Sequence, residues 1–254
     1  MNRGLIFEVD GNRLTGGVAK NEEPKAVVVL CHGIPSGMPD EPDDRGYPGL
    51  ADDIASNGFE VWWFNFRGAR DSTGVFTYGG WIDDLHAVIA SIRSETDLPI
   101  FVVGSSAGGA VALMAASEDP SISAVATLAA PAYWARDEGL DDGLLVHSRR
   151  IGLLPPDLPI DEDAWWAEFE TNRPEWAVAL LGGRPLLVLQ GTEDRVVSPA
   201  HAQRLYDHAM EPKSMLVLEG AGHQLRRDQR AVDAIVRWVD EWAEIASVRL
   251  RERN

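Results

Sequence analysis

Short runs of apolar residues alternate with longer amphipathic segments along most of the chain. The short runs are rich in Val, Ile, Leu and Ala and have few polar positions, which is typical of strands buried on both faces of a sheet. They occupy residues 26–31, 60–66, 99–103, 123–130, 185–190 and 215–218. An N-terminal hairpin is also predicted, because residues 5–8 and 13–19 flank the turn sequence Asp10-Gly11-Asn12.

The segments between these runs have the periodicity and end signals of helices. Helices are predicted over residues 47–57, 81–93, 109–116, 199–210 and 228–245. Strands that alternate with helices along a chain form a parallel sheet with helices on both faces. The predicted fold class is therefore α/β, with a mostly parallel central sheet.

Composition narrows the class of protein without identifying it. The chain has 254 residues, 45% of them hydrophobic, which suits one large α/β domain. Its formal net charge of −17 argues against nucleic acid and anionic membranes as partners. No apolar run approaches the roughly 20 residues of a membrane span, and the N-terminus lacks a signal-peptide core, so a cytoplasmic location is expected. Cys31 is the one cysteine, which excludes an internal disulfide.

The stretch Gly104-Ser105-Ser106-Ala107-Gly108 carries the strongest chemical signal. It lies between the predicted strand at 99–103 and the small-residue helix at 109–116. A G-x-S-x-G sequence between a strand and a helix is typical of a nucleophile elbow, a sharp turn that exposes the central serine. Glycine two residues before and after that serine permits the close approach of the strand and the helix. Ser106 is therefore the candidate nucleophile.

A candidate acid and a candidate base follow at the ends of two later strands. The turn Gly191-Thr192-Glu193-Asp194-Arg195 comes directly after residues 185–190, and His223 comes shortly after residues 215–218. Ligands bind where the carboxyl ends of parallel strands meet, and a serine nucleophile needs a base oriented by a carboxylate. We expect His223 to be the base and Asp194 its carboxylate partner, with Glu193 as the alternative acid.

An oxyanion formed at Ser106 requires backbone N–H donors nearby. The predicted donors are the N–H of Ala107, after the nucleophile, and the N–H of Ile34, after the strand at 26–31. Pro35 has no N–H and is excluded. His32 is expected to hold this loop through its ring.

The other histidines are assigned smaller roles. His86 is expected on the surface of its helix, and His201 and His208 flank a helix that begins at Ser198-Pro199. His147 is a further candidate for contact with substrate.

Together these motifs resemble the α/β-hydrolase superfamily over nearly the whole chain. Residues 64–74 resemble that family's D-x-R-G-x-G-x-S loop, with departures at Asn65 and Asp71. Within the superfamily the chain is similar to small esterases and to serine-aminopeptidase-like hydrolases. The resemblance implies a Ser-His-Asp triad of Ser106, His223 and Asp194, and a reaction that needs no metal and no cofactor.

The resemblance also implies a role for residues 132–184, which contain no convincing strand. In such folds an insertion at this place forms a helical cap over the site, so we divide the chain into a core of 1–131 and 185–254 and a cap of 132–184. The aromatic residues of this segment either attach the cap to the core or line an acyl pocket. Tyr133 and Trp134, directly after a strand, are the predicted pocket residues.

The sequence predicts a serine hydrolase that cleaves a carboxylic ester with a short or medium acyl chain. An amidase or aminopeptidase with the same triad stays open, and Glu168 is a candidate to bind a substrate amine. A thioesterase and a non-catalytic binding protein on the same scaffold are further alternatives. The expected partner is a small acyl substrate, and a homodimer is as compatible with the sequence as a monomer.

Overall fold

A computed structural model describes residues 2–38, 41–136 and 143–251 of the chain. Its centre is an eight-stranded sheet with the strand order β1-β2-β4-β3-β5-β6-β7-β8. The hairpin of β1 and β2 is antiparallel, β2 pairs antiparallel with β4, and all later neighbours are parallel. The strands are β1 (Asn2–Val9), β2 (Asn12–Ala19), β3 (Val27–Cys31), β4 (Glu60–Phe64), β5 (Ile100–Ser105), β6 (Ile122–Leu128), β7 (Leu186–Gly191) and β8 (Lys213–Leu218). The predicted mostly parallel sheet is confirmed.

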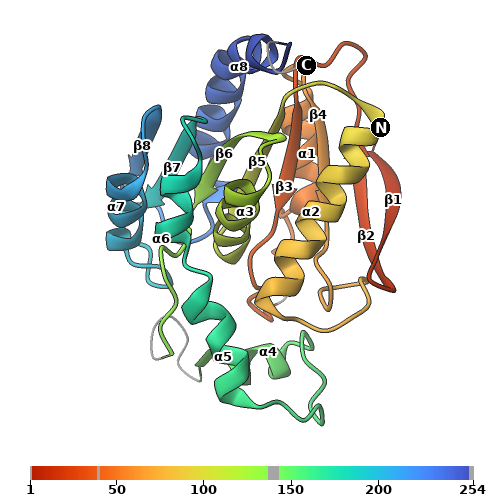
Figure 1. Cartoon of the computed structure of the whole chain (residues 1–254), viewed down its shortest axis with the longest axis vertical. Helices are drawn as coiled ribbons and strands as arrows, with labels where there is room; N and C mark the ends of the chain where they lie inside the picture. The colour runs from red at the N-terminus through yellow and green to blue at the C-terminus, as the bar shows by residue number, and fades with distance from the viewer. Residues whose placement is uncertain (1, 39–40, 137–142, 252–254) are drawn as a thin grey trace.

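Helices cover both faces of this sheet (Figure 1). Successive residues of a strand point to opposite faces, and in β3 the side chains of Val27 and Val29 enter one hydrophobic cluster while those of Val28 and Leu30 enter another. The first cluster includes α2 (Tyr78–Glu95), α3 (Ala107–Glu118) and α7 (Pro199–His208), and the second includes α1 (Gly46–Ala55) and α8 (Gln229–Arg251). Burial on both faces explains why the strands are apolar without alternation.

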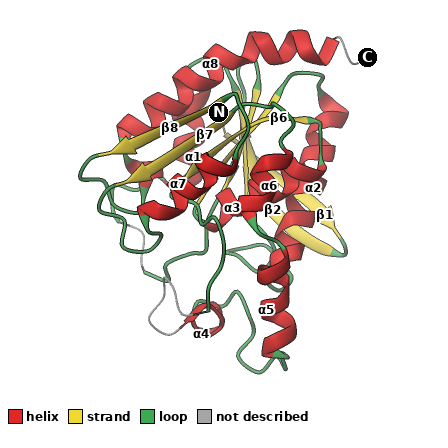
Figure 2. Cartoon of the chain, turned by 60° about the vertical axis from the view of Figure 1, so that its left-hand side comes forward, coloured by secondary structure: helices red, strands yellow, loops and turns green. Residues whose placement is uncertain are grey.

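The segment between β6 and β7 has two parts that pack differently. Helices α4 (Gly143–Arg150) and α5 (Glu162–Thr171) project beyond the sheet (Figures 1 and 2). In contrast, α6 (Pro174–Ala177) and the short turn η1 (Val178–Leu180) pack against α3 and α7, within the layers of the core. Residues 137–142 of the predicted cap lie outside the described part. The division of the chain into core and cap domains stays a prediction.

Aromatic side chains attach α5 to the start of α2. The rings of Tyr78 and Phe169 are stacked with centroids 5.0 Å apart, and Trp165 meets Phe76 edge-on at 6.0 Å. Trp176, in α6, differs from these because it is 55% exposed. Trp165 and Phe169 therefore hold α5 to the core, which is one of the two roles that the sequence left open.

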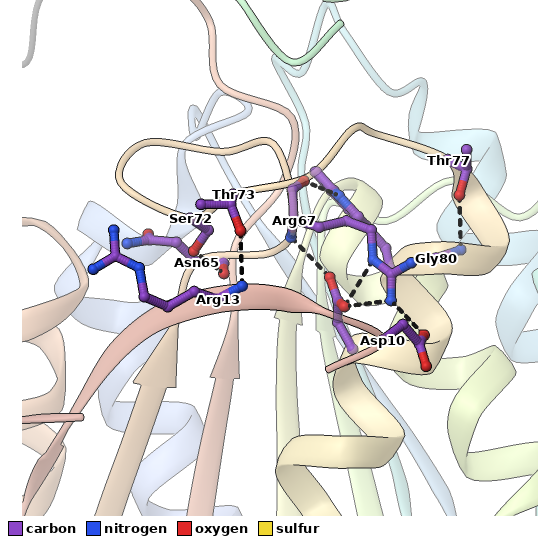
Figure 3. Close-up of polar contacts among 10 residues, drawn as sticks. Asp10, Arg13, Asn65, Arg67, Ser72, Thr73, Thr77 and Gly80 are labelled. Atoms are coloured by element: carbon purple, nitrogen blue, oxygen red, sulfur yellow. Dashed lines mark hydrogen bonds and ion pairs between the residues drawn. The ribbon is translucent and has the colours of Figure 1, made fainter. Parts of the chain in front are cut away.

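A polar network holds residues 65–73 between the β1–β2 hairpin and α2 (Figure 3). Arg67 donates through Nε to the buried Asp84 at 2.8 Å and forms a second ion pair with Asp10 at 3.2 Å. On the other side the Arg13 N–H donates to Thr73 Oγ1 at 2.7 Å. Asn65, where the family pattern has Asp, donates to a hydroxyl of β2 at 2.9 Å. The loop is thus anchored at both ends despite that departure.

In the described residues, no helix is both long and apolar enough to cross a membrane. The turn η2 (Leu225–Arg227) completes the secondary structure and separates β8 from α8.

Candidate active site

Ser106 lies in a strained turn between β5 and α3. Its φ of 52° and ψ of −125° lie in a region that L-residues seldom adopt, at a cost of about 1–3 kcal/mol. The strand and helix approach so closely that a Cβ on Gly104 would collide with the backbone of Gly108. A Cβ on Gly108 would collide with the His32 oxygen, beyond the end of β3. Gly104 is therefore required by the turn itself and Gly108 by the neighbouring strand end. Ser106 follows the carboxyl end of a central strand.

Asp194 and His223 are hydrogen-bonded to each other beyond the ends of β7 and β8. His223 Nδ1 lies 2.9 Å from Asp194 Oδ2, so the proton is on Nδ1 and Nε2 keeps its lone pair. The other carboxylate oxygen accepts from the N–H groups of Val196 at 2.8 Å and Val197 at 2.9 Å. Glu193 is exposed. Of the two acids that the sequence offered, Asp194 is the one that contacts the imidazole.

The pKa of Asp194 reflects two opposed effects. Burial alone would raise this pKa, but the hydrogen bond and charge of His223 and the two backbone N–H donors hold it below its usual range. Asp194 is therefore ionised at neutral pH and can keep His223 in one tautomer. The Asp194 side chain is fully buried, which limits competition from water for its oxygens.

Gln190, at the end of β7, is a fully buried side chain that the sequence analysis did not identify. Its Nε2 donates to Asp194 Oδ2 and to the Val197 carbonyl, both at 3.1 Å. It therefore fixes the carboxylate and the turn that follows it. The available signal was a polar residue at the last position of an otherwise apolar strand.

The loop after β3 approaches Ser106 closely. A Cβ on Gly33 would lie 2.8 Å from the Cβ of Ser106, so only glycine fits there. The N–H groups of Ile34 and Ala107 make no hydrogen bond to any other residue in the described ranges. Both are therefore available to a ligand at Ser106.

His32 holds this loop, as the sequence predicts. Its Nε2 accepts from the Phe66 N–H at 3.0 Å and its Nδ1 donates to the Gly33 carbonyl at 2.7 Å. Burial lowers the pKa of His32 to about 4, against the smaller opposing effect of the Gly33 hydrogen bond. The ring is neutral at physiological pH, which its hydrogen bond from Phe66 requires.

These residues meet in a cavity of about 730 Å³. Every site residue predicted from the sequence is part of its lining: Ile34, Ser106, Ala107, Tyr133, Trp134, Asp194 and His223. Helix α4 contributes Leu144, His147 and Arg150, and α5 contributes Trp166. The cavity therefore lies between the carboxyl ends of the strands and the helices that project beyond them.

The structure adds to or changes the expectations for three single residues. His201, expected only at the start of its helix, is also 6% exposed, lines the cavity and has its ring 4.5 Å from that of Tyr133. His86 is half-buried rather than on the surface, 3.3 Å from the Ala115 carbonyl. Glu168 lies outside the cavity lining and accepts from the Gly79 N–H at 3.1 Å, where it satisfies the start of α2.

The described residues also contain no group of three or more His, Cys, Asp or Glu side chains arranged to hold a metal ion. Cys31 is buried at the end of β3, and burial strongly raises the pKa of its thiol. It is therefore no candidate nucleophile.

Comparison with known proteins agrees with the fold. The sequence model of the family described as serine aminopeptidase, S33, matches residues 22–175. A monoglyceride lipase homolog of monkeypox virus is 21% identical over 86% of this chain and 89% of its own length. Human monoglyceride lipase is 24% identical over 58% of this chain and 61% of its own. The solved esterase domain of a Rhodothermus marinus protein superposes with a TM-score of 0.70 at 22% identity, over 96% of this chain and 98% of that one.

Proposed function

The chain belongs to the serine aminopeptidase, S33, family within the α/β-hydrolase superfamily, and from this premise we propose that it is a carboxylesterase acting through a Ser-His-Asp triad. The observation that carries the proposal is the shared cavity, which Ser106, His223 and Asp194 all line. The hydrogen bond from His223 Nδ1 to Asp194 leaves Nε2 free to accept a proton. That is the tautomer a general base requires.

In the proposed reaction Ser106 Oγ attacks the carbonyl carbon of the ester while His223 Nε2 takes its proton. The oxyanion that forms accepts hydrogen bonds from the N–H groups of Ile34 and Ala107. His223 then protonates the leaving alcohol as the carbon–oxygen bond breaks, and an acyl-enzyme remains on Ser106. Water, deprotonated by His223, attacks this ester, the acid leaves and Ser106 regains its proton.

Two features favour an ester with an acyl chain of short to medium length. A cavity of about 730 Å³ lined by Ile34, Tyr133, Trp134, Leu144 and Trp166 offers an apolar surface to such a chain. Human monoglyceride lipase, named for acyl esters of glycerol, and a homolog of such a lipase are among the relatives. A glycerol ester is accordingly one substrate to test first.

The family description favours an aminopeptidase as the second candidate. Such an enzyme needs an acidic group to bind the substrate's ammonium ion. In the described part of the cavity lining the one carboxylate is Asp194, which is already occupied by His223 and backbone donors. The ester proposal is preferred for this reason.

A substrate panel tests the two candidates directly. We expect kcat/KM for a p-nitrophenyl butyrate-type ester to exceed that for an aminoacyl-p-nitroanilide by several orders of magnitude, and an acyl thioester to fall between them. A higher kcat/KM for the aminoacyl amide would reverse the assignment. The Ser106→Ala variant is the control, because any hydrolysis that it still shows does not depend on Ser106.

A further inference from the structure

The loop that carries the Ile34 N–H is held by few hydrogen bonds. Residues 32–36 form no regular structure, and His32 secures only the Gly33 carbonyl on the near side of Ile34. Pro35 has no N–H to donate. The position of the Ile34 donor therefore depends on what fixes the backbone beyond it.

The Pro35 carbonyl is fixed from α4. Nε2 of His147 lies 2.9 Å from this oxygen, and the two residues are 112 positions apart in the chain. Nδ1 of the same ring lies 2.9 Å from Nη2 of Arg150. A carbonyl only accepts and a guanidinium only donates, so His147 must be neutral with its proton on Nε2. His147 is 4% exposed, which limits competition from water for either bond.

A second contact shows that α4 and the loop are packed together. Gly37 has a φ of +75°, and a Cβ at this position would lie 2.6 Å from Cγ2 of Ile151, directly after α4. The chain beyond is anchored to the core, since the Leu153 carbonyl accepts from the Phe76 N–H at 3.1 Å. The loop therefore packs against Ile151, and the chain two residues later is hydrogen-bonded to Phe76, just before α2.

We propose that His147 is a positioning residue through which helix α4 holds the oxyanion loop, and with it the Ile34 N–H, against Ser106. The proposal rests on the proposed function, because it assigns Ile34 the oxyanion. His147 itself touches no reacting atom in this account. It acts by fixing the Pro35 carbonyl, so that the donor needs no reorganisation when the transition state forms.

A hydrogen bond that the Ile34 N–H makes only in the transition state affects kcat rather than KM. Displacing a catalytic donor by about 1 Å costs up to about 100-fold in rate, and removing one costs about 100- to 1,000-fold. Loss of the His147 link should therefore lower kcat about 10- to 100-fold and leave KM nearly unchanged. The affinity for a boronic acid, whose tetrahedral adduct with Ser106 places an oxygen in the oxyanion site, should fall by a similar factor.

His147→Asn and His147→Gln form the test pair. The amide nitrogen of Gln occupies the place of Nε2 and reaches the Pro35 carbonyl, whereas that of Asn occupies the place of Nδ1 and does not. We expect the Asn variant to lose kcat and boronate affinity as stated and the Gln variant to stay within about fivefold of wild type. His86→Gln, which changes another histidine bonded to a carbonyl, should leave both unchanged. Thermal unfolding of each variant separates a loss of the link from a loss of the fold.

Three results would overturn the inference: equal kcat in the Asn and Gln variants, a rise in KM without a fall in kcat, or a boronate affinity that does not follow kcat. A KM effect would mean that His147 contacts the substrate instead. Failure of the proposed function would appear differently, as wild-type enzyme that hydrolyses esters without an acyl-enzyme burst. If either variant fails to fold, Gly37→Ala, which pushes the same loop from α4, must reproduce the fall in kcat.

Discussion

The two sides of the cavity are held in place by different kinds of contact. On the side of Asp194 the carboxylate accepts hydrogen bonds from Gln190, Val196 and Val197, all within four positions of it in the chain. On the side of Ile34 the loop is held by His32, whose ring is bonded to Phe66 34 positions away, and by His147, 112 positions from Pro35. The geometry around Asp194 is set by residues close to it in the sequence. The geometry around Ile34 forms only after residues 132–184 have packed against the loop.

The largest effect is expected at Ser106, because the groups on both sides of the cavity are proposed to act on its reaction. Ser106→Ala removes the proposed nucleophile and should lower turnover of an activated ester on the order of 10⁶-fold. Ser105→Ala changes the preceding strand residue and should keep most of the activity. Turnover of a p-nitrophenyl ester by the two variants measures the difference. Equal and mild losses would show that neither side of the cavity is arranged around Ser106.

The second largest effect is expected on the Asp194 side of the cavity. Asp194→Asn removes the charge and presents an N–H₂ group to His223, which favours the wrong tautomer, so turnover should fall about 10⁴-fold. Glu193→Gln, at the exposed neighbouring position, should change it little. Circular dichroism checks that both variants are folded. A larger loss in the Glu193 variant would transfer the role to that residue.

The acid dependence of stability should differ between the two sides. His32 stays neutral in the folded protein down to its pKa of about 4, whereas an unfolded histidine titrates near about 6.5. The unfolded state then binds more protons, so the free energy of unfolding should drop by about 3 kcal/mol as pH falls through this window. The pKa of Asp194 is lowered instead, so its contribution is lost only at more acidic pH, below the ordinary value of a carboxyl group.

Urea unfolding of wild type and His32→Gln at pH 7, 5.5 and 4.5 measures this separation. The variant should lose most of the pH dependence over that range, because glutamine has no proton to gain. An unchanged dependence in the variant would mean that other groups govern the acid limb, and that the Ile34 side has no acid sensitivity of its own.

The smallest expected effect concerns the packing of the Ile34 loop against the residue that follows α4. Gly37 and Gly11 both have positive φ, but only a Cβ on Gly37 meets another residue, Ile151. The positive φ alone should cost about 1–2 kcal/mol of stability when either glycine is replaced by alanine. Only Gly37→Ala should also lower kcat, by about tenfold, because it pushes the loop that carries Ile34. Equal kcat in the two variants would show that the loop tolerates displacement.

The sequence predicts the fold well because most of its elements are locally encoded. The apolar runs became β3 to β8 within a few residues, and the Asp10-Gly11-Asn12 turn gave the antiparallel hairpin. The G-x-S-x-G motif also predicted a strained Ser106, and Gly104 is required by contacts with Gly108 and Gly109 in the same turn. Most of these features depend on residues close together in the chain.

Contacts between distant segments could not be predicted in this way. The pairing of His147 with Pro35, the place of His201 beside Tyr133 and the role of Glu168 at the start of α2 all depend on how residues 132–184 return to the core. No local pattern marks them, because each involves an ordinary polar residue on a helix. Gln190 lies between these two cases. Its partner Asp194 is four positions away in the chain, but its burial depends on the neighbouring strands of the sheet.

The most direct test of the account is covalent. Wild-type protein is mixed with an activated p-nitrophenyl ester, quenched in acid within the first turnover, and analysed by intact and peptide mass spectrometry. The account predicts one added acyl group, located on Ser106 and absent from Ser106→Ala. Ester hydrolysis without an adduct, or an adduct that persists in the variant, would contradict an acyl-enzyme at Ser106.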